Sequence, residues 1–383
     1  MARALYIHWP FCLQKCPYCD FNSHVRSGVD HARWQAALIA DMRAEAELAG
    51  GEALDSIFFG GGTPSLMPPA LVAALLAEAE KLWGFAPGIE ITLEGNPSSV
   101  EAANYAALAS AGVNRASLGL QSLHDETLRF LGRLHNAEEG LKALEVAQGV
   151  FKRVTFDLIY ALPGQTPAQW QADLTRALSF DTSHLSLYQL TIEPGTRFET
   201  LVRQGQFHPL DDDAAADLFD LTQDLTRAAG LPAYEISNHA RPGEESRHNL
   251  TYWRYFDYVG IGPGAHGRRG GIATQRHRKP ENWLTAVVDR GSGNQVEQAI
   301  SQATQASEAL LMGLRLAEGI DLAALSARVG IPADHLFDAA EADKLGLLGL
   351  LRREGLHLTV TPQGMPLLDA ILPRLIPDAL VSG

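Results

Sequence analysis

Cys12-Leu-Gln-Lys-Cys16-Pro-Tyr-Cys19 directly follows the apolar run at residues 4–7, and its three cysteines are the only ones among 383 residues. Thiolates are ligands for iron–sulfur clusters, zinc and copper(I). Three thiolates on one short loop can hold a four-iron cluster and leave one iron open to a small molecule, as catalytic zinc sites keep an open position. A zinc site completed by His8 or His24 is the alternative, although closed zinc loops usually show a second ligand pair at fixed spacing.

Short apolar runs alternate with helical stretches from residue 3 to about residue 190. We predict strands at residues 4–8, 56–59, 90–94, 116–121, 154–159 and 184–190, and helices at residues 30–49, 69–83, 100–111, 137–149 and 167–178. This alternation predicts an α/β fold of parallel strands with helices packed outside. Six units are too few for an eight-stranded barrel, so we expect an open, partial (β/α)6 barrel. Its functional loops should lie beyond the carboxyl ends of the strands.

Unusual polar segments follow the ends of the predicted strands, where functional loops of such a fold are expected. The first strand ends in the cysteine loop, and the next ones end at residues 60–64, 94–97, 121 and 157–163. Residues 60–64 read Gly-Gly-Gly-Thr-Pro, which is typical of a strand-to-helix turn. Because three glycines exceed what a turn needs, we favour a backbone that closely approaches a ligand.

The C-x3-C-x2-C spacing and Tyr6-Ile-His8-Trp-Pro10-Phe11-Cys12 resemble the radical S-adenosylmethionine (SAM) superfamily, in its oxygen-independent coproporphyrinogen III oxidase (HemN)-like branch. Further matches are Leu93-Glu94-Gly-Asn-Pro, Gly119-Leu-Gln121-Ser, Leu131-Gly-Arg133 and Asp157-Leu-Ile-Tyr-Ala-Leu-Pro163-Gly. The resemblance implies a TIM-like radical SAM partial barrel and a 4Fe-4S cluster held by Cys12, Cys16 and Cys19. It also implies SAM contacts from Tyr6, Tyr18, Gly61, Gly62, Thr63, Glu94, Gln121, Arg133 and Asp157. Residues 188–196 should face the same reaction cavity.

A second unusual stretch is His248-Asn249-Leu-Thr-Tyr252-Trp253. An isolated histidine of this kind is usually a surface residue beside aromatic core anchors. However, neutral imidazole is a common axial ligand of haem iron, and aromatic rings pack on porphyrin faces. The H-N-x-x-Y-W pattern resembles the haem-chaperone members of the family, which implies haem contacts from His248, Asn249, Tyr252 and Trp253. The glycine-rich residues 260–267 should form a close-packed turn rather than a dinucleotide site, because Pro263 interrupts the pattern.

The remaining chain predicts a helix at residues 211–230, a strand at 233–236 and an irregular segment at 261–302. The basic residues of that segment are Arg268, Arg269, Arg276, Arg278 and Lys279. We expect them to lie in a solvated loop. The alternative is that they contact porphyrin propionates or an acidic partner. Helices at 307–316, 322–329 and 332–348 precede a hairpin at 351–353 and 356–360, which predicts a mostly helical, winged-helix-like domain. We therefore expect three domains: a radical SAM core at 1–200, an extension at 201–302 and a C-terminal domain at 303–383.

Composition narrows the function further. A formal net charge of −14 disfavours nucleic-acid binding, which depends on cations that displace counterions. The sequence has no apolar run long enough to span a membrane and no signal peptide, although peripheral membrane contact stays open. Clustered cysteines of odd number predict a reducing cytoplasm.

Two functions follow from the resemblance. We favour a haem chaperone that binds the cluster, SAM and haem and delivers haem to haem-requiring apoproteins, with a one-electron reductant as a further partner. The alternative is oxidative decarboxylation of coproporphyrinogen III. True oxidases of the family carry an additional cysteine where this chain has Phe21, and a longer N-terminal extension, so both departures favour the chaperone. The sequence leaves open whether SAM is cleaved.

Overall fold

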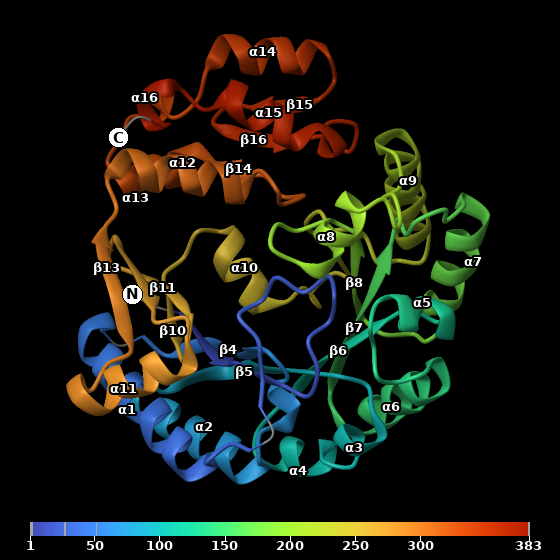
Figure 1. The fold of residues 1–383 in the computed structure, drawn as a ribbon. Helices are drawn as coiled ribbons and strands as arrows, with labels where there is room; N and C mark the ends of the chain where they lie inside the picture. The colour runs from blue at the N-terminus through green and yellow to red at the C-terminus, as the bar shows by residue number, and fades with distance from the viewer. Residues whose placement is uncertain (1–2, 27, 51, 382–383) are drawn as a thin grey trace.

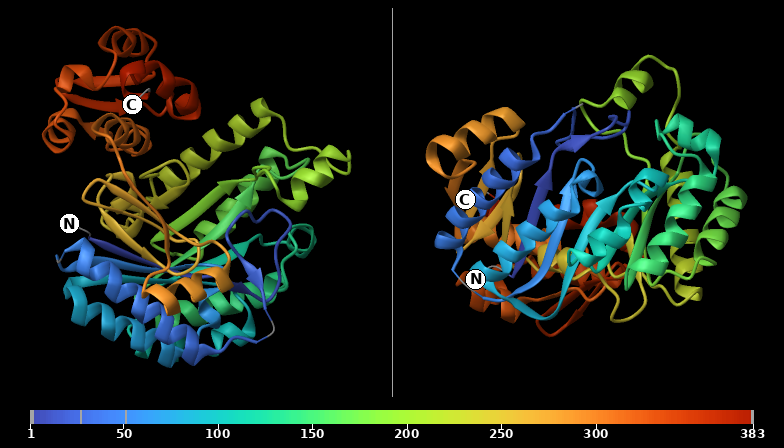
Figure 2. Two further views of the ribbon diagram at one scale, coloured as in Figure 1. Left: turned by 60° about the vertical axis from the view of Figure 1, so that its left-hand side comes forward. Right: turned by 90° about the horizontal axis from the view of Figure 1, so that it is seen from below.

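The centre of the protein is a sheet of parallel strands, seen in a computed structural model that describes residues 3–26, 28–50 and 52–381. Neighbours in the sheet are also consecutive along the chain. The strands are β1 (Ala4–Trp9), β4 (Leu54–Gly61), β5 (Phe85–Gly95), β6 (Arg115–Gln121), β7 (Arg153–Tyr160) and β8 (His184–Gln189). Helices lie on the outer side of this curved sheet (Figures 1 and 2). The predicted partial (β/α)6 barrel is confirmed.

Most outer helices form where the helical spacing of apolar residues predicts them. They are α1 (His31–Ala49), α2 (Pro69–Trp83), α6 (Ala137–Val150) and α7 (Pro167–Leu178). Asp30 caps α1 by accepting a hydrogen bond from the Arg33 amide, and Trp34, Leu38 and Met42 form its buried face. The helix predicted at residues 100–111 is instead two short helices, α3 (Ser99–Ala102) and α4 (Tyr105–Ser110). Further short helices that were not predicted are α5 (Asp125–Phe130) and α8 (Arg197–Arg203).

The sheet is wider than expected, with eleven strands. Strand β10 (Tyr258–Ile261) pairs in parallel with β1, and β11 (His266–Arg269), β12 (Ile272–Arg276) and β13 (Asn294–Ala299) continue the sheet in antiparallel order. At the other edge β9 (Asn238–Ala240) pairs with β8. The prediction of an irregular segment at 261–302 was therefore wrong, and so was the strand at 233–236. Helices α9 (Asp212–Ala228) and α11 (Pro280–Arg290) complete this region.

Buried arginines explain why β11 and β12 were missed. The guanidinium of Arg276 is fully buried and contacts Asp41 Oδ2 and Glu45 Oε2, each at 3.0 Å. Arg269 Nε donates to Glu45 Oε1 at 2.6 Å. Both carboxylates come from α1, more than 200 residues away in sequence. The prediction of a solvated loop is therefore wrong for Arg268, Arg269 and Arg276, which are buried. Arg278 and Lys279 are exposed.

The C-terminal residues form a second lobe beside the barrel (Figure 2). Its helices are α12 (Gln302–Gly313), α13 (Leu322–Val329), α14 (Ala339–Leu347), α15 (Leu368–Leu375) and α16 (Asp378–Val381). Its small sheet has the order β14 (Ile320–Asp321), β16 (His357–Val360), β15 (Leu351–Glu354). Leu310, Leu322, Leu358 and Ile371 belong to a core separate from that of the barrel. The predicted helical domain with a hairpin is confirmed. Single 3-10 turns lie at Pro64–Leu66, Ala333–His335 and Met365–Leu367.

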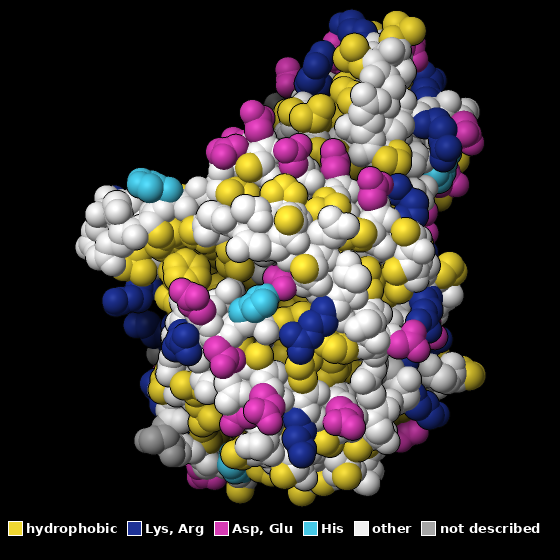
Figure 3. Space-filling view, turned by 90° about the vertical axis from the view of Figure 1, so that its right-hand side faces the viewer, with side chains coloured by type: hydrophobic (Ala, Val, Ile, Leu, Met, Phe, Trp, Pro, Cys, Tyr) yellow, Lys and Arg dark blue, Asp and Glu magenta, His cyan; other side chains and the backbone are white. Residues whose placement is uncertain are grey.

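The surface in Figure 3 carries acidic and basic side chains interspersed, without a single dominant basic area on that face. Within the described ranges, no helix combines the length and apolar character that a membrane crossing needs.

Candidate functional site

The cysteine loop lies over the carboxyl ends of the parallel strands. It connects β2 (Phe11–Cys12) to β3 (His24–Val25), which pair with each other in parallel. All three cysteines line one cavity of about 700 Å³. Burial raises the pKa of the Cys12 and Cys19 thiols, while hydrogen bonds from neighbouring hydroxyls partly oppose this effect. Among the described residues, histidine, cysteine and acidic side chains form no group that is compact enough to hold a single metal ion.

Arg133 is the cation that joins the loop to the barrel. One guanidinium nitrogen, Nη1, lies 3.5 Å from Cys16 Sγ and 3.4 Å from the Tyr18 hydroxyl. The other, Nη2, donates to Asn96 Oδ1 at 2.5 Å and to the Gly119 carbonyl at 2.8 Å. Arg133 Nε is buried and has no hydrogen-bond partner among the described residues. The side chain therefore places a positive charge beside a sulfur that cluster binding would make negative, and it keeps one donor unused.

The glycines at the end of β4 are required by packing. A Cβ at Gly61, whose φ is +115°, would lie 2.6 Å from the His8 ring. A Cβ at Gly62 would lie 2.6 Å from the backbone oxygen of Phe11, just before the first cysteine. Close approach to β1 and to the cysteine loop thus explains these glycines without a ligand. Both also line the cysteine cavity, so the bare backbone faces its interior.

Two partly buried carboxyl groups, from β5 and β7, face this cavity. Burial, and then repulsion from Asp157, raise the pKa of Glu94 to about 8, while the Gly61 amide opposes this by donating to Glu94 Oε2 at 3.2 Å. Burial raises the pKa of Asp157 to about 6, against a hydrogen bond from Ser186 and the charges of Arg115 and Arg133. Such carboxyl groups can accept hydrogen bonds from hydroxyl or ammonium groups of a ligand.

Strand ends on the far side complete the cavity wall. Gln121 has a φ of +67°, a left-handed conformation that is strained for a non-glycine residue and common at functional sites. Tyr188 at the end of β8 lines the cavity, as predicted for residues 188–196. Arg315 and Asp369 reach the cavity from the C-terminal lobe. Sequence reasoning missed both, because nothing local in the sequence shows that this lobe approaches the barrel.

The predicted cluster and SAM residues lie together, with one exception. The cavity is lined by Cys12, Cys16, Cys19, Tyr18, Gly61, Gly62, Thr63, Glu94, Gln121, Arg133 and Asp157. Tyr6 lines a neighbouring cavity of about 450 Å³ instead, and its hydroxyl lies 2.9 Å from His8 Nδ1. Ligand contacts from all these residues stay predictions.

The H-N-x-x-Y-W motif forms the helix α10 (Arg247–Trp253), which was not predicted. His248 is only 2% exposed; Nδ1 lies 3.1 Å from Ser56 Oγ, and Nε2 lies 2.9 Å from the Tyr252 hydroxyl. Burial lowers its pKa to about 3. Asn249 donates to the Tyr234 hydroxyl at 3.2 Å, and Trp253 lies under the Arg315 guanidinium. Tyr252 lines the cavity that Tyr6 also lines. An iron contact from either ring nitrogen of His248 would require the hydrogen bond of that nitrogen to open.

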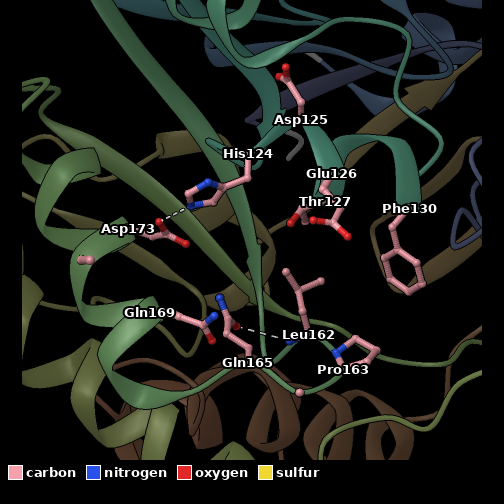
Figure 4. Close-up of a pocket in the computed structure, with 12 residues that line it drawn as sticks. His124, Asp125, Glu126, Thr127, Phe130, Leu162, Pro163, Gln165, Gln169 and Asp173 are labelled. Atoms are coloured by element: carbon pink, nitrogen blue, oxygen red, sulfur yellow. Dashed lines mark hydrogen bonds and ion pairs between the residues drawn. The ribbon is translucent and has the colours of Figure 1, made fainter.

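A third cavity lies apart from these two, between α5 and α7 (Figure 4). His124 Nε2 and Asp173 Oδ1 face each other across it at 2.6 Å. It shares no lining residue with the cysteine cavity and contains no predicted site residue.

Comparison with known proteins agrees with this geometry. The profile described as Radical SAM superfamily matches residues 6–177, and that of the HemN C-terminal domain matches residues 300–367. The chain is 44% identical over 269 residues to Heme chaperone HemW of Escherichia coli, covering 69% of this chain and 70% of that one. It is 38% identical to the mitochondrial Radical S-adenosyl methionine domain-containing protein 1 of Bos taurus, over 97% of this chain and 87% of that one.

Among solved structures, coproporphyrinogen III oxidase (HemN) from Escherichia coli matches with a TM-score of 0.81. The alignment covers 97% of this chain and 89% of that chain at 22% identity, which establishes a common fold. The profiles, the relatives and the fold lead to one assignment: the chain belongs to the radical SAM superfamily, in the family that contains the HemW heme chaperones.

Proposed function

We propose that this protein is a haem chaperone that holds a 4Fe-4S cluster, SAM and haem and delivers haem to haem-requiring apoproteins. The observation that carries the proposal is the 44% identity to a protein named Heme chaperone HemW. Phe21, at the position where the oxidases of the family have an additional cysteine, also favours the chaperone over the oxidase.

The cysteine cavity supports the cluster and SAM parts of the proposal. Cys12, Cys16 and Cys19 would hold the cluster, and the absence of any other cysteine in the sequence leaves one iron for a small molecule. The cluster with SAM would supply one-electron chemistry. The unused Nε donor of Arg133 fits an additional acceptor, such as a cluster sulfide or a ligand carboxylate.

The chain's own residues would orient the small molecule. Glu94 and Asp157 would accept hydrogen bonds from its hydroxyl or ammonium groups, and the backbone of Gly61 and Gly62 lines the same cavity. Glu94 is largely protonated near pH 7, so binding of a cationic group would release a proton from it. Arg315 adds a positive charge to the cavity wall, which would favour an anionic group of a ligand.

Two further parts of the hypothesis concern the domain boundaries and the cellular compartment. We propose the division into residues 1–200, 201–302 and 303–383, which the separate core of the C-terminal lobe supports for the last boundary. The free, clustered cysteines support a reducing compartment such as the cytoplasm.

Anaerobic reconstitution of the cluster followed by two parallel assays tests the function. In one assay the protein receives haem and is then mixed with a haem-free acceptor protein; in the other it receives coproporphyrinogen III, SAM and a one-electron reductant. We expect haem uptake and transfer without protoporphyrinogen formation. A Cys16→Ser variant serves as the cluster-deficient control. Formation of protoporphyrinogen by the reconstituted protein but not by this variant would replace the chaperone with the oxidase.

A further inference from the structure

The cavity that contains Tyr6, named here the His266 cavity, adjoins the cysteine cavity. Gly61, Glu94 and Phe21 line both cavities. Phe21 is 61% exposed, so an apolar ring is available to a ligand where the two cavities meet. The volume of about 450 Å³ falls in the range of about 300–1,000 Å³ typical of small-molecule sites. The His266 cavity is therefore large enough for a flat ligand that stays partly exposed.

Two imidazoles line the His266 cavity, and only one is accessible. His8 is engaged through both ring nitrogens, with the Tyr6 hydroxyl and the Asn22 carbonyl each at 2.9 Å. His266 is exposed, and within the described part of the chain its ring has a single hydrogen-bond contact, from Gln275 Nε2 to His266 Nε2 at 3.4 Å.

Aromatic and cationic groups surround this imidazole. The rings of Tyr252 and Tyr258 pack edge to face, with centroids 4.4 Å apart, and both line the His266 cavity. Flat rings of this kind pack against a porphyrin face. The exposed guanidinium of Arg278 lies at the same cavity and could pair with a carboxylate. An imidazole, a cation and an aromatic wall match the chemistry of haem: an iron, two propionates and an apolar ring.

We propose that the His266 cavity is the haem site, with His266 as the axial ligand and Arg278 facing a propionate. This assignment rests on the proposed function. His248 is then a positioning residue: its Nε2 holds the hydroxyl of Tyr252 at 2.9 Å, and Tyr252 forms the wall of the cavity. The H-N-x-x-Y-W motif would shape the haem site without supplying the iron ligand.

The cysteine loop forms part of the same cavity. Asn22 follows Cys19 by three residues, and its Nδ2 donates to the carbonyls of Pro263 and Arg278, each at 2.9 Å. A Cβ at Gly264 would lie 2.5 Å from that nitrogen, so the turn that precedes His266 packs directly on the loop. Order in the cysteine loop should therefore favour order in the haem site.

The test is a titration of the reconstituted protein with ferric haem, followed by Soret absorbance and electron paramagnetic resonance. His266→Ala should lose the histidine-ligated spectrum and weaken haem binding at least about tenfold, and added imidazole should restore the spectrum. His248→Ala should keep the histidine-ligated spectrum. His124→Ala, in the separate cavity of Figure 4, is the matched control and should behave like the unchanged protein.

The results separate this proposal from the proposed function. Haem uptake with an unchanged spectrum in His266→Ala would overturn the haem site and leave the chaperone function standing. No haem uptake by the unchanged protein would overturn the function itself. His266→Gln provides a second variant if alanine disturbs folding, as judged by the cluster absorbance. For Arg278→Gln, we expect similar affinity for haem and haem dimethyl ester, whereas the unchanged protein should prefer haem. Equal preference in both proteins would remove Arg278 from the site.

Discussion

Replacing Glu94 by glutamine should stabilise the cluster-free protein near pH 8 and leave its stability unchanged near pH 4.5. The folded protein raises the pKa of Glu94 to about 8 from an ordinary 4.5, so it binds this proton more tightly than the unfolded chain does. A raised carboxyl pKa means that the free energy of unfolding falls as pH rises from about 4.5 to about 8 and then levels off. Glutamine carries no such charge and can still accept from the Gly61 amide.

The size of the effect follows from the pKa difference. About 3.5 pH units correspond to roughly 5 kcal/mol, at about 1.4 kcal/mol per unit. Glu94 lines two cavities, and water that enters them solvates part of the carboxylate. We therefore expect about half of that value, roughly 2–3 kcal/mol near pH 8, after discounting for solvent screening. This gain should raise the melting temperature by at least about 4 °C, at roughly 2–4 °C per kcal/mol.

Thermal unfolding of the cluster-free protein, followed by circular dichroism from pH 5 to pH 8.5, measures this gain. Glu80→Gln on the exposed side of α2 is the matched control, because it removes the same charge from the surface. The melting curves of Glu94→Gln and the unchanged protein should diverge with rising pH. Parallel pH profiles would refute the idea that Glu94 is destabilised by its charge.

Three further substitutions test the packing around the site. Gly62→Ala places a Cβ 2.6 Å from the Phe11 carbonyl oxygen. We therefore expect urea unfolding to show a free energy of unfolding lower by about 1–3 kcal/mol, and the protein to hold less iron. A normal iron content would contradict this expectation. Arg276→Met leaves the buried carboxylate of Asp41 without its cation, and a loss of about 3–5 kcal/mol should appear in the same assay. Gln121→Gly relieves left-handed strain of about 1–2 kcal/mol, so the melting temperature should hold while SAM affinity, measured by calorimetry, falls. Undiminished SAM affinity would exclude Gln121 from the site.

The sequence predicts the parallel part of the fold because local patterns determine it. Each of the six strands predicted between residues 4 and 190 is present, and α2 and α7 have the predicted bounds. Prediction failed where distant residues decide the environment. Arg276 looks like a loop residue until Asp41 and Glu45 neutralise it inside the sheet. No local pattern shows that the segment around it is a strand.

The same reasoning applies to the candidate site. The cysteine loop and the strand-end motifs could be predicted to meet, since parallel strands bring their carboxyl ends to one edge. The surroundings of His248 could not, because its partner Ser56 lies 192 residues earlier. His266 was noted only as part of a tight glycine turn. Its accessibility depends on how β11 extends the sheet, which the sequence pattern does not reveal.

The position of the first strand has a consequence for synthesis of the protein. Strand β1 lies between β4 and β10, so one of its two edges is completed only by residues 258–261. A nascent chain that has emerged as far as β8 still exposes the open edge of β1 on the ribosome, because β10 has not yet been made. The cysteine loop that follows β1 cannot reach its final packing until the turn at residues 262–264 has been made. Insertion of the cluster should therefore come late, after most of the polypeptide has been translated.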